Sequence, residues 1–248
     1  MEIIQITDLH ITKNVANTKN ACKPYLTLSK TLKHIKEHYP QVKDLVITGD
    51  LSNDYSKESY EAIKELLKIY EFNIFILPGN HDCLEHIQAI CDSQISTDSI
   101  DLRSFNIVAF NFDTHVPGKI NGRLKKVEIN EFNEKLNNNS HIDKIIIFTH
   151  HPVTRINSRW IDKHICENSD ELIELMLSQN NKEFKIFSGH VHQEFYYRKN
   201  NIEFFTTPST CYQFKKKSED FSLEDNVSYG YRVITLHDNN IKTKVVRV

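Results

Sequence analysis

The sequence has 248 residues and a mass of 29.1 kDa, which suits one large domain or at most two small ones. Hydrophobic residues make up 39% of the chain and charged residues 26%, so a core can form and wholesale disorder is excluded. The 31 basic and 33 acidic side chains leave a formal net charge of −2, which argues against a protein that mainly binds nucleic acid or an anionic membrane.

Short apolar runs predict the strands of a sheet. Each run is rich in β-branched residues and nearly continuous, as is typical of strands that are buried on both faces. In chain order the runs cover residues 3–6, 45–47, 74–77, 145–148 and 184–187. A cluster of polar and often ionisable side chains directly follows each run.

Helical periodicity separates these strands. Apolar residues recur with helical spacing over residues 25–35 and 60–70, and a third helix is predicted to begin near Leu172, with Ser169 as its cap. Helices that alternate with buried strands indicate a layered α/β fold.

The end of the chain has a different pattern. Residues 195–205 and 231–248 resemble two hairpins that turn at residues 200–201 and 238–240. The basic run at residues 215–217 is predicted to be a solvated loop.

The sequence contains no internal repeat, low-complexity tract or linker, so residues 1–248 are expected to form one domain. The motifs that carry chemistry lie in residues 8–192, and residues 193–248 form a β-rich part of the same domain. No apolar run approaches the ~18 residues of a membrane span, and the first residues lack the pattern of a secretory signal.

The cysteines indicate a compartment. There are 5, an odd number, and their spacing fits neither a metal knuckle nor a redox motif. We therefore expect reduced thiols and a cytoplasmic protein, with Cys211 packed in the fold and not used as a nucleophile. The cysteines are Cys22, Cys83, Cys91, Cys166 and Cys211.

The polar clusters are expected to lie near one another, because ligands of open α/β sheets bind beyond the carboxyl ends of the strands. Gly49, Gly79 and Gly189 lie inside the clusters although the chain has only 6 glycines. Glycine at these positions would let the backbone turn sharply while the next side chain points to a common centre.

The clusters differ in how specific they are. Asp8 and His10 taken alone are explained more simply by a structural turn, and His190 with His192 is an equally common pattern. Residues 79–82 read Gly-Asn-His-Asp, for which the composition predicts only about 0.002 occurrences. The presence of all these patterns at strand ends makes coincidence a poor explanation.

The side chains of the clusters suit divalent metals. Residues i and i+2 of an extended segment point the same way, so Asp8 with His10, and His190 with His192, can each direct two ligands to one place. A mixture of Asp, His and one amide suits Mn²⁺, Fe²⁺ or Zn²⁺ and does not suit a thiolate site. The number of ligands favours two ions about 3.5–4 Å apart that share a carboxylate, as in phosphoryl-transfer sites.

The order of the motifs resembles that of the calcineurin-like metallophosphoesterases. The shared motifs are Asp-x-His, Gly-Asp, Gly-Asn-His-Asp, His-x-Pro and Gly-His-x-His, and they begin at residues 8, 49, 79, 150 and 189. A tighter similarity links the chain to the bacterial class III 3′,5′-cyclic AMP phosphodiesterases. The segments that carry it are residues 48–54, 77–82, 160–164, 167–168, 189–194 and 207–214.

This resemblance implies a single-domain, four-layer α/β/β/α sandwich with two metals at one edge. It assigns one metal to Asp8, His10, Asp50 and His192. It assigns the second metal to Asp50, Asn80, His150 and His190, so that Asp50 bridges the two ions. The doublet of His150 and His151 leaves the choice of ligand open, and the family's His-x-Pro pattern favours His150.

The resemblance also implies the catalytic roles. His81 would donate a proton to the departing 3′-oxygen, and Asp82 would orient His81 and stabilise its cationic form. Asp54 and His151 would support the ligands from behind. The substrate would contact His10, Asp50, Asn80, His81 and His192.

The implied reaction is hydrolysis of 3′,5′-cyclic AMP to 5′-AMP, with a hydroxide that bridges the metals as nucleophile. Fe²⁺ or Mn²⁺ is the expected metal, with Zn²⁺ as a further candidate. The same centre would suit a 2′,3′-cyclic nucleotide or a glycerophosphodiester, so these substrates stay open. A non-catalytic scaffold of the same fold is a remote alternative, because such a protein would have lost ligands.

The expected partner is a small cyclic nucleotide. No nucleic acid or membrane is expected to bind, given the net charge of −2 and the lack of an apolar span. The chain is expected to be a monomer or a homodimer.

Overall fold

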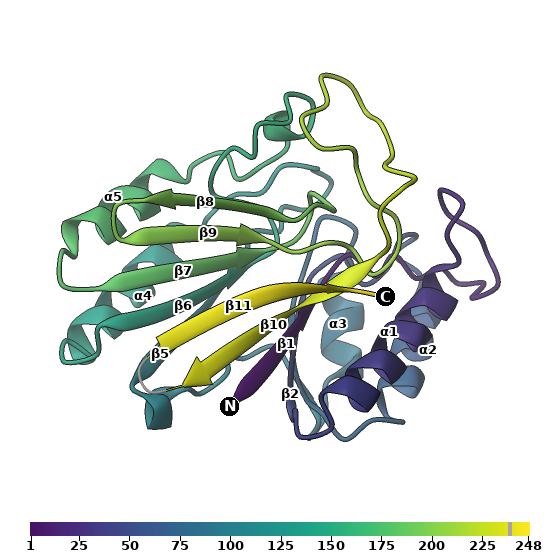
Figure 1. Cartoon of the computed structure of the whole chain (residues 1–248), viewed down its shortest axis with the longest axis horizontal. Coiled ribbons are helices and arrows are strands. Elements are labelled where there is room, and N and C mark those ends of the chain that lie inside the picture. The colour runs from purple at the N-terminus through teal and green to yellow at the C-terminus, as the bar shows by residue number, and fades with distance from the viewer. Residues whose placement is uncertain (238–239) are drawn as a thin grey trace.

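The computed structural model describes residues 1–237 and 240–248, and in this part of the chain the strands form two sheets, of six and five strands. The two sheets pack face to face, and helices cover their outer faces (Figure 1). The result is the α/β sandwich in a single domain that the resemblance implied.

The first sheet is largely parallel. Its strands are β1 (Glu2–Ile6), β2 (Asp44–Thr48), β3 (Asn73–Leu77), β4 (Ile95–Ser96), β10 (Gly230–His237) and β11 (Asn240–Arg247). Their order is β11-β10-β1-β2-β3-β4, with β1 to β4 parallel. The antiparallel pair β10 and β11 extends the sheet beside β1.

The second sheet has a similar design. Its strands are β5 (Ile107–Phe112), β6 (Lys144–Thr149), β7 (Glu183–Ser188), β8 (Phe195–Lys199) and β9 (Ile202–Thr206). Their order is β5-β6-β7-β9-β8, and only the edge strand β8 runs antiparallel to its neighbour. The parallel strands of both sheets therefore present their carboxyl ends at an edge of the sandwich.

Helices cover the outer face of each sheet. The helices against the first sheet are α1 (Pro24–His38), α2 (Lys57–Leu67) and α3 (Leu84–Ile90). Those against the second sheet are α4 (Lys126–Asn138) and α5 (Asp170–Ser178). Two short 3₁₀ turns, η1 (Arg103–Phe105) and η2 (Ile161–Lys163), lie in loops.

Side-chain alternation along the strands explains the four layers. In β2, Leu45 and Ile47 pack in the cluster that includes α1, α2 and α3, while Val46 packs between the two sheets. In β6, Ile145 packs in the cluster with α4 and α5, while Ile146 packs between the sheets. Successive residues of a strand point to opposite faces, so a strand between two apolar layers needs a continuous apolar run.

Most predicted elements are confirmed. The predicted strands correspond to β1, β2, β3, β6 and β7, and the predicted helices to α1, α2 and α5. The first hairpin is β8 with β9. The second is β10 with β11, although two of its expected turn residues, 238 and 239, lie outside the described residues.

Two strands and two helices of the described residues were missed, and one detail was wrong. Strands β4 and β5 and helices α3 and α4 were not predicted. Helix α4 carries only a narrow apolar stripe of Ile129, Phe132 and Leu136 in a polar sequence. Ser169 does precede α5, but its side chain makes no capping hydrogen bond.

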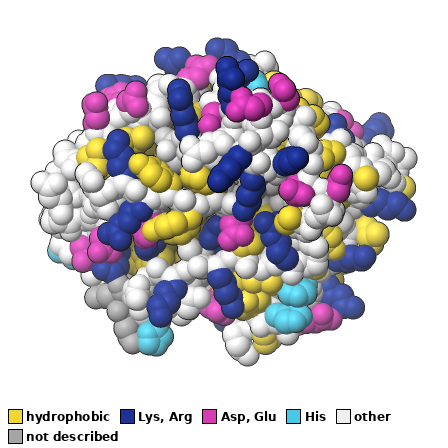
Figure 2. Space-filling model, turned by 45° about the horizontal axis from the view of Figure 1, so that its top comes forward, with side chains coloured by type: hydrophobic (Ala, Val, Ile, Leu, Met, Phe, Trp, Pro, Cys, Tyr) yellow, Lys and Arg dark blue, Asp and Glu magenta, His cyan; other side chains and the backbone are white. Residues whose placement is uncertain are grey.

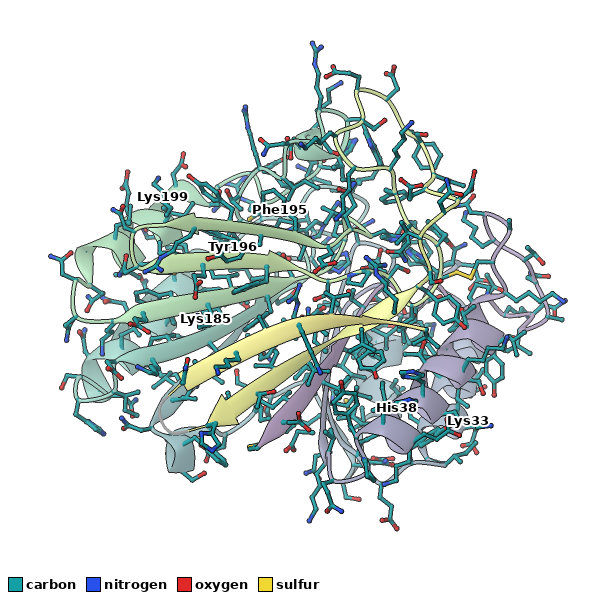
Figure 3. All side chains as sticks on the ribbon, in the orientation of Figure 1. Lys33, His38, Lys185, Phe195, Tyr196 and Lys199 are labelled. Atoms are coloured by element: carbon teal, nitrogen blue, oxygen red, sulfur yellow. A yellow bond between two sulfur atoms is a disulfide. The ribbon has the colours of Figure 1, made fainter. Side chains whose placement is uncertain are left out.

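The expectation of reduced thiols is wrong for two cysteines. Cys22 and Cys211 form a disulfide across a sequence separation of 189 residues, which Figure 3 shows as a yellow bond. Cys83, Cys91 and Cys166 are free. The pair joins the loop before α1 to the loop after β9, so only the tertiary structure brings the two sulfur atoms together.

The surface agrees with the near-zero net charge. Figure 2 shows one face on which Lys and Arg side chains lie among Asp and Glu side chains. Residues 215–217, the basic run, are exposed as predicted. Among the residues that the structure describes, no helix has the length and apolar character needed to cross a membrane.

Candidate metal centre

The predicted ligand-type side chains lie together at the carboxyl ends of the parallel strands. Those after β1, β2 and β3 come from the first sheet, and those after β6 and β7 come from the second. All are buried, with at most 7% of their surface exposed. They are Asp8, His10, Asp50, Asn80, His150, His190 and His192.

One half of the centre joins the two sheets through Asp8, His10 and His192. The Nε2 atoms of His10 and His192 lie 3.0 Å apart, and His192 Nε2 lies 3.4 Å from Asp8 Oδ1. His10 Nε2 also lies 3.7 Å from Asp50 Oδ2. Ligand atoms of Asp8, His10 and His192 can therefore meet around one point.

The other half lies around His150. Its Nε2 atom is 3.2 Å from Asn80 Oδ1 and 3.3 Å from Asp50 Oδ1. The ring of His190 lies 5.2 Å from the ring of His150. Asp50 thus directs one carboxylate oxygen to His10 and the other to His150, which is the geometry required of a bridging carboxylate.

Hydrogen bonds from behind fix the histidine rings. His150 Nδ1 lies 2.7 Å from the carbonyl oxygen of Thr48, and His192 Nδ1 lies 2.9 Å from that of Tyr212. Because a carbonyl only accepts, each Nδ1 carries the proton and each Nε2 presents a lone pair to the centre.

The hydrogen bonds of the ring nitrogens also distinguish His150 from His151. His151 Nδ1 is 2.8 Å from Thr114 Oγ1, and its Nε2 is 2.9 Å from the carbonyl oxygen of Ile120. Both ring nitrogens of His151 are therefore engaged, whereas Nε2 of His150 faces Asn80 and Asp50. This geometry favours His150 as the ligand, with the ring of His151 packed 4.5 Å from that of His190.

The electrostatics of the centre suit cations. Burial raises the pKa of the Asp50 carboxyl, so its ionised form needs a compensating positive charge. Burial lowers the pKa of His10 and of His190, which keeps both imidazoles neutral and able to donate a lone pair.

One histidine nitrogen is also left without a hydrogen bond. Nε2 of His190 is buried and has no hydrogen-bond partner within the described part of the protein. An orphaned acceptor beside carboxylates and neutral imidazoles fits a site built to hold divalent metals.

The side chain of Asp82, which was expected to orient His81, makes its hydrogen bonds with other groups. Its carboxylate accepts hydrogen bonds from the backbone of Leu51 (3.0 Å), Ser52 (3.2 Å) and Gly79 (2.8 Å), and from the Tyr60 hydroxyl (2.9 Å). These bonds tie the turn after β2 to the turn after β3. Asp82 therefore positions the backbone around the candidate ligands.

Asp54, which was expected to support the ligands, makes its hydrogen bonds within a neighbouring loop. Its carboxylate accepts hydrogen bonds from the backbone of Lys13 (2.9 Å) and from the Ser56 hydroxyl (2.6 Å), just before α2. Neither partner is a candidate ligand, so Asp54 shapes the surrounding loop. The sequence motif placed it beside the centre, but its side chain points to the loop.

His81 lies at the edge of the centre. Its backbone N–H donates to Asp50 Oδ1 (2.8 Å), and its ring lies 5.3 Å from the ring of His10. The ring is partly exposed, and its Nδ1 has no hydrogen-bond partner among the described residues. His81 therefore faces the space where a ligand of the centre would lie.

A cavity of about 310 Å³ opens over the centre. Candidate ligands and His81 line one side of it, and Trp160, Tyr212, Phe214 and Phe221 line another. Tyr212 stacks on His10 at 5.3 Å. These aromatic residues were given no role from the sequence, although Trp160, Tyr212 and Phe214 lie in the family-like segments 160–164 and 207–214.

Comparison with known proteins identifies the family. Residues 1–194 match the model of the calcineurin-like phosphoesterase family, so the chain belongs to this family. The chain is 30% identical over 254 residues to a 3′,5′-cyclic-nucleotide phosphodiesterase of Nostoc sp., covering 100% of this chain and 92% of the relative. It is also 30% identical over 250 residues to the 3′,5′-cyclic adenosine monophosphate phosphodiesterase CpdA of Haemophilus influenzae, covering 100% and 90%.

A solved structure shares the fold. A dimetal phosphatase from Danio rerio superposes with a TM-score of 0.74 at 11% identity, covering 99% of this chain and 95% of that chain. The low identity limits this similarity to the fold.

Proposed function

We propose that this protein is a metal-dependent phosphodiesterase that hydrolyses 3′,5′-cyclic AMP to 5′-AMP. The observation that carries the proposal is the convergence of buried Asp, His and Asn side chains from both sheets beneath one open cavity. The substrate is supported by full-length relatives that are named cyclic-nucleotide phosphodiesterases.

Two divalent cations, Fe²⁺ or Mn²⁺, would supply positive charge for the phosphoryl oxygens and for activation of water. The residues would divide into two ligand sets that share Asp50. One set is Asp8, His10, Asp50 and His192, and the other is Asp50, Asn80, His150 and His190. The neutral imidazoles and the ionised carboxylates of these sets match the ligands that such metals prefer.

The protein's own groups would position the phosphodiester and move one proton. His81, at the edge of the cavity, would donate a proton to the 3′-oxygen as the bond from phosphorus to that oxygen breaks. His10, Asp50, Asn80 and His192 would lie against the phosphate on the opposite side. Asp82 contributes indirectly, because it holds the backbone of the turns that carry Asp50 and Asn80.

The test is a hydrolysis panel on protein reconstituted separately with Fe²⁺, Mn²⁺ and Zn²⁺. The substrates are 3′,5′-cyclic AMP, 3′,5′-cyclic GMP, 2′,3′-cyclic AMP and a bis-aryl phosphate. We expect 5′-AMP from 3′,5′-cyclic AMP as the preferred reaction. Preference for 2′,3′-cyclic AMP would replace the proposed substrate, and inactivity on every diester with both metals bound would overturn the proposed enzyme.

The location and the assembly of the protein are further proposals. We infer a cytoplasmic protein that is a monomer or a homodimer. The disulfide between Cys22 and Cys211 counts against this location, because stable disulfides are rare in reducing compartments. Cell fractionation tests the location, and light scattering coupled to gel filtration tests the assembly.

A further inference from the structure

Aromatic side chains form a wall of the cavity beside the metal centre. Trp160 packs edge to face against Phe214 (4.9 Å) and Phe221 (5.3 Å), and all three line the cavity of about 310 Å³ together with His10 and Asn80. We call these three residues the aromatic wall. The volume of the cavity lies at the low end of the roughly 300–1,000 Å³ that is typical of small-molecule sites.

Two loops hold the aromatic wall in place. Trp160 precedes η2 in the loop after β6, while Phe214 and Phe221 lie in the loop after β9, which rises above the sheets in Figure 1. An ion pair of Arg159 with Glu219 (3.0 Å) joins the loops. The backbone N–H of Ser218 also donates to Ser158 Oγ (3.3 Å).

The wall is continuous with the metal centre. The ring of Phe214 stacks on the ring of His192, with centroids 4.3 Å apart and planes inclined by 18°. Behind them, Ile161 and Val191 pack with Phe214 in a small buried cluster. A ligand whose phosphate lies at the metal centre would therefore extend naturally along the wall.

The wall has the properties of a surface for a flat aromatic ring. Phe221 is 58% exposed although it is a large apolar side chain, so a bound ring would bury surface that is now in water. Two buried polar atoms of cavity-lining residues, Trp160 Nε1 and Asn53 Oδ1, have no hydrogen-bond partner among the described residues. Nucleobases combine a flat π surface with edge donors and acceptors, and stack on aromatic side chains whatever their sequence.

We infer that the aromatic wall binds the nucleobase of the cyclic nucleotide. This inference rests on the proposed function and deepens it, because it places selection of a nucleotide over a base-free diester at Trp160, Phe214 and Phe221. A glycerophosphodiester has no ring and would leave the wall exposed.

The first experiment uses the fluorescence of Trp160, since the chain has 1 Trp. Metal-loaded protein is titrated with 5′-AMP, and with ribose 5-phosphate as the matched ligand that lacks a base. We expect a saturable change in emission with 5′-AMP and none with ribose 5-phosphate. The same change with both ligands, or no change with 5′-AMP at concentrations that inhibit hydrolysis, would overturn the inference.

The second experiment uses Phe221→Ala. Loss of stacking should raise KM for 3′,5′-cyclic AMP by roughly 5–100-fold and change kcat little, because the base is remote from the reacting atoms. Hydrolysis of the 3′,5′-cyclic phosphate of 1,2-dideoxyribose, which has no base, should be unchanged. Phe221→Tyr should retain the native KM, and Phe105→Ala, at a Phe 39% exposed in η1, is the control for loss of a surface aromatic.

The outcomes separate the inference from the proposed function. If 3′,5′-cyclic AMP is hydrolysed but Phe221→Ala keeps the native KM, the inference is wrong and the proposed function stands. If 5′-AMP changes the emission of Trp160 but no cyclic nucleotide is hydrolysed, the base site stands and the proposed reaction is wrong.

Discussion

Several candidate ligands share an unusual backbone conformation. Asp8, His10, Asp50, His190 and His192 all have positive φ angles, between 46° and 66°. For residues other than glycine this conformation costs roughly 1–2 kcal/mol each. Hydrogen bonds between the turns, such as His10 N–H to the Asp50 carbonyl (3.0 Å), maintain it. Strain of this kind clusters at functional sites, where the surrounding fold over-determines the backbone.

Asn80→Ala should weaken one metal and leave the fold intact. Among the described residues, the Asn80 side chain makes one hydrogen bond, with His150 Nε2 (3.2 Å), so little of the fold depends on it. We expect metal affinity to fall by at least about tenfold, together with turnover. Metal content of the folded variant, with circular dichroism as the check on folding, measures the effect.

The matched control is Asn138→Ala, at an exposed position of α4. It should keep native metal content and rate. Native metal content and rate in Asn80→Ala would remove Asn80 from the centre.

His81→Ala should distinguish proton donation from other roles. A ribose 3′-oxygen is a poor leaving group, whereas nitrophenolate leaves largely unaided. We expect the variant to slow hydrolysis of 3′,5′-cyclic AMP by roughly 10²–10⁴-fold and to slow a nitrophenyl diester distinctly less. Both rates are measured at saturating metal, with His141→Ala at an exposed position as the control.

Equal losses on the two substrates would assign His81 to charge stabilisation or phosphate binding instead. Loss of metal from the variant would indicate a structural role beside Asn80.

Among the elements, the disulfide links two loops that reach the cavity. Cys22 ends the loop that contributes Lys19 and Asn20 to the cavity, and Cys211 precedes Tyr212, which stacks on His10. Cys22→Ser should therefore raise KM as well as lower stability. Disulfides typically contribute about 2–4 kcal/mol, which for a chain of this size lowers Tm by roughly 4–16 °C.

Thermal unfolding and steady-state kinetics measure both effects. Native protein treated with a dithiol should match Cys22→Ser, and Cys91→Ser, which removes a free thiol, should behave as native protein. If the dithiol changes neither Tm nor KM of the native protein, the disulfide does not contribute to stability or to substrate binding as predicted.

Helix α4 carries a carboxyl group that should destabilise the fold at high pH. Burial raises the pKa of Glu128 to about 7, and its Oε2 has no hydrogen-bond partner in the described residues. Because the folded pKa lies above the unfolded value of 4.5, stability is highest below that value and falls as the pH rises to about 7. Glu128→Gln should raise Tm at pH 8 and change it little at pH 4, and the reverse pattern would contradict this account.

At the scale of the whole molecule, the candidate metal centre depends on the close approach of the two sheets. Gly189 follows β7, and a Cβ there would lie 1.9 Å from Thr7 Oγ1 and 3.0 Å from Asp8 Oδ2, which follow β1. Gly189→Ala should push the sheets apart and disturb Asp8 and His190 together. We expect overpacking of about 1–3 kcal/mol, a lower Tm and loss of bound metal.

Gly118→Ala is the control, because it adds a Cβ at a positive φ with no atom within 4 Å. It should lower Tm slightly and keep native metal content. Equal metal loss in both variants would contradict the account that metal binding requires the close approach of the two sheets at Gly189.

Local pattern was enough to predict most strands, three of the five α-helices in the described residues and the polar clusters at the strand ends. Ile145 and Ile146 both sit in apolar layers, so the run reads as a buried strand without any tertiary information. His150 directly follows β6, the strand that contains this run, so its place at a strand end needs only the local sequence. Helix α4 was missed because its apolar stripe is narrow, and packing against the second sheet decides its place.

What the sequence alone determined was the set of strand ends and the polar residues on them, because both depend on neighbours in the chain. Tertiary structure decided which partner each side chain meets. Asp82 binds groups from the turn after β2 and from α2 and not its neighbour His81. Cys22 meets Cys211, and Trp160 meets Phe221, across long sequence separations. Such contacts form only when separate turns and loops converge in the folded chain, and no local periodicity encodes that convergence.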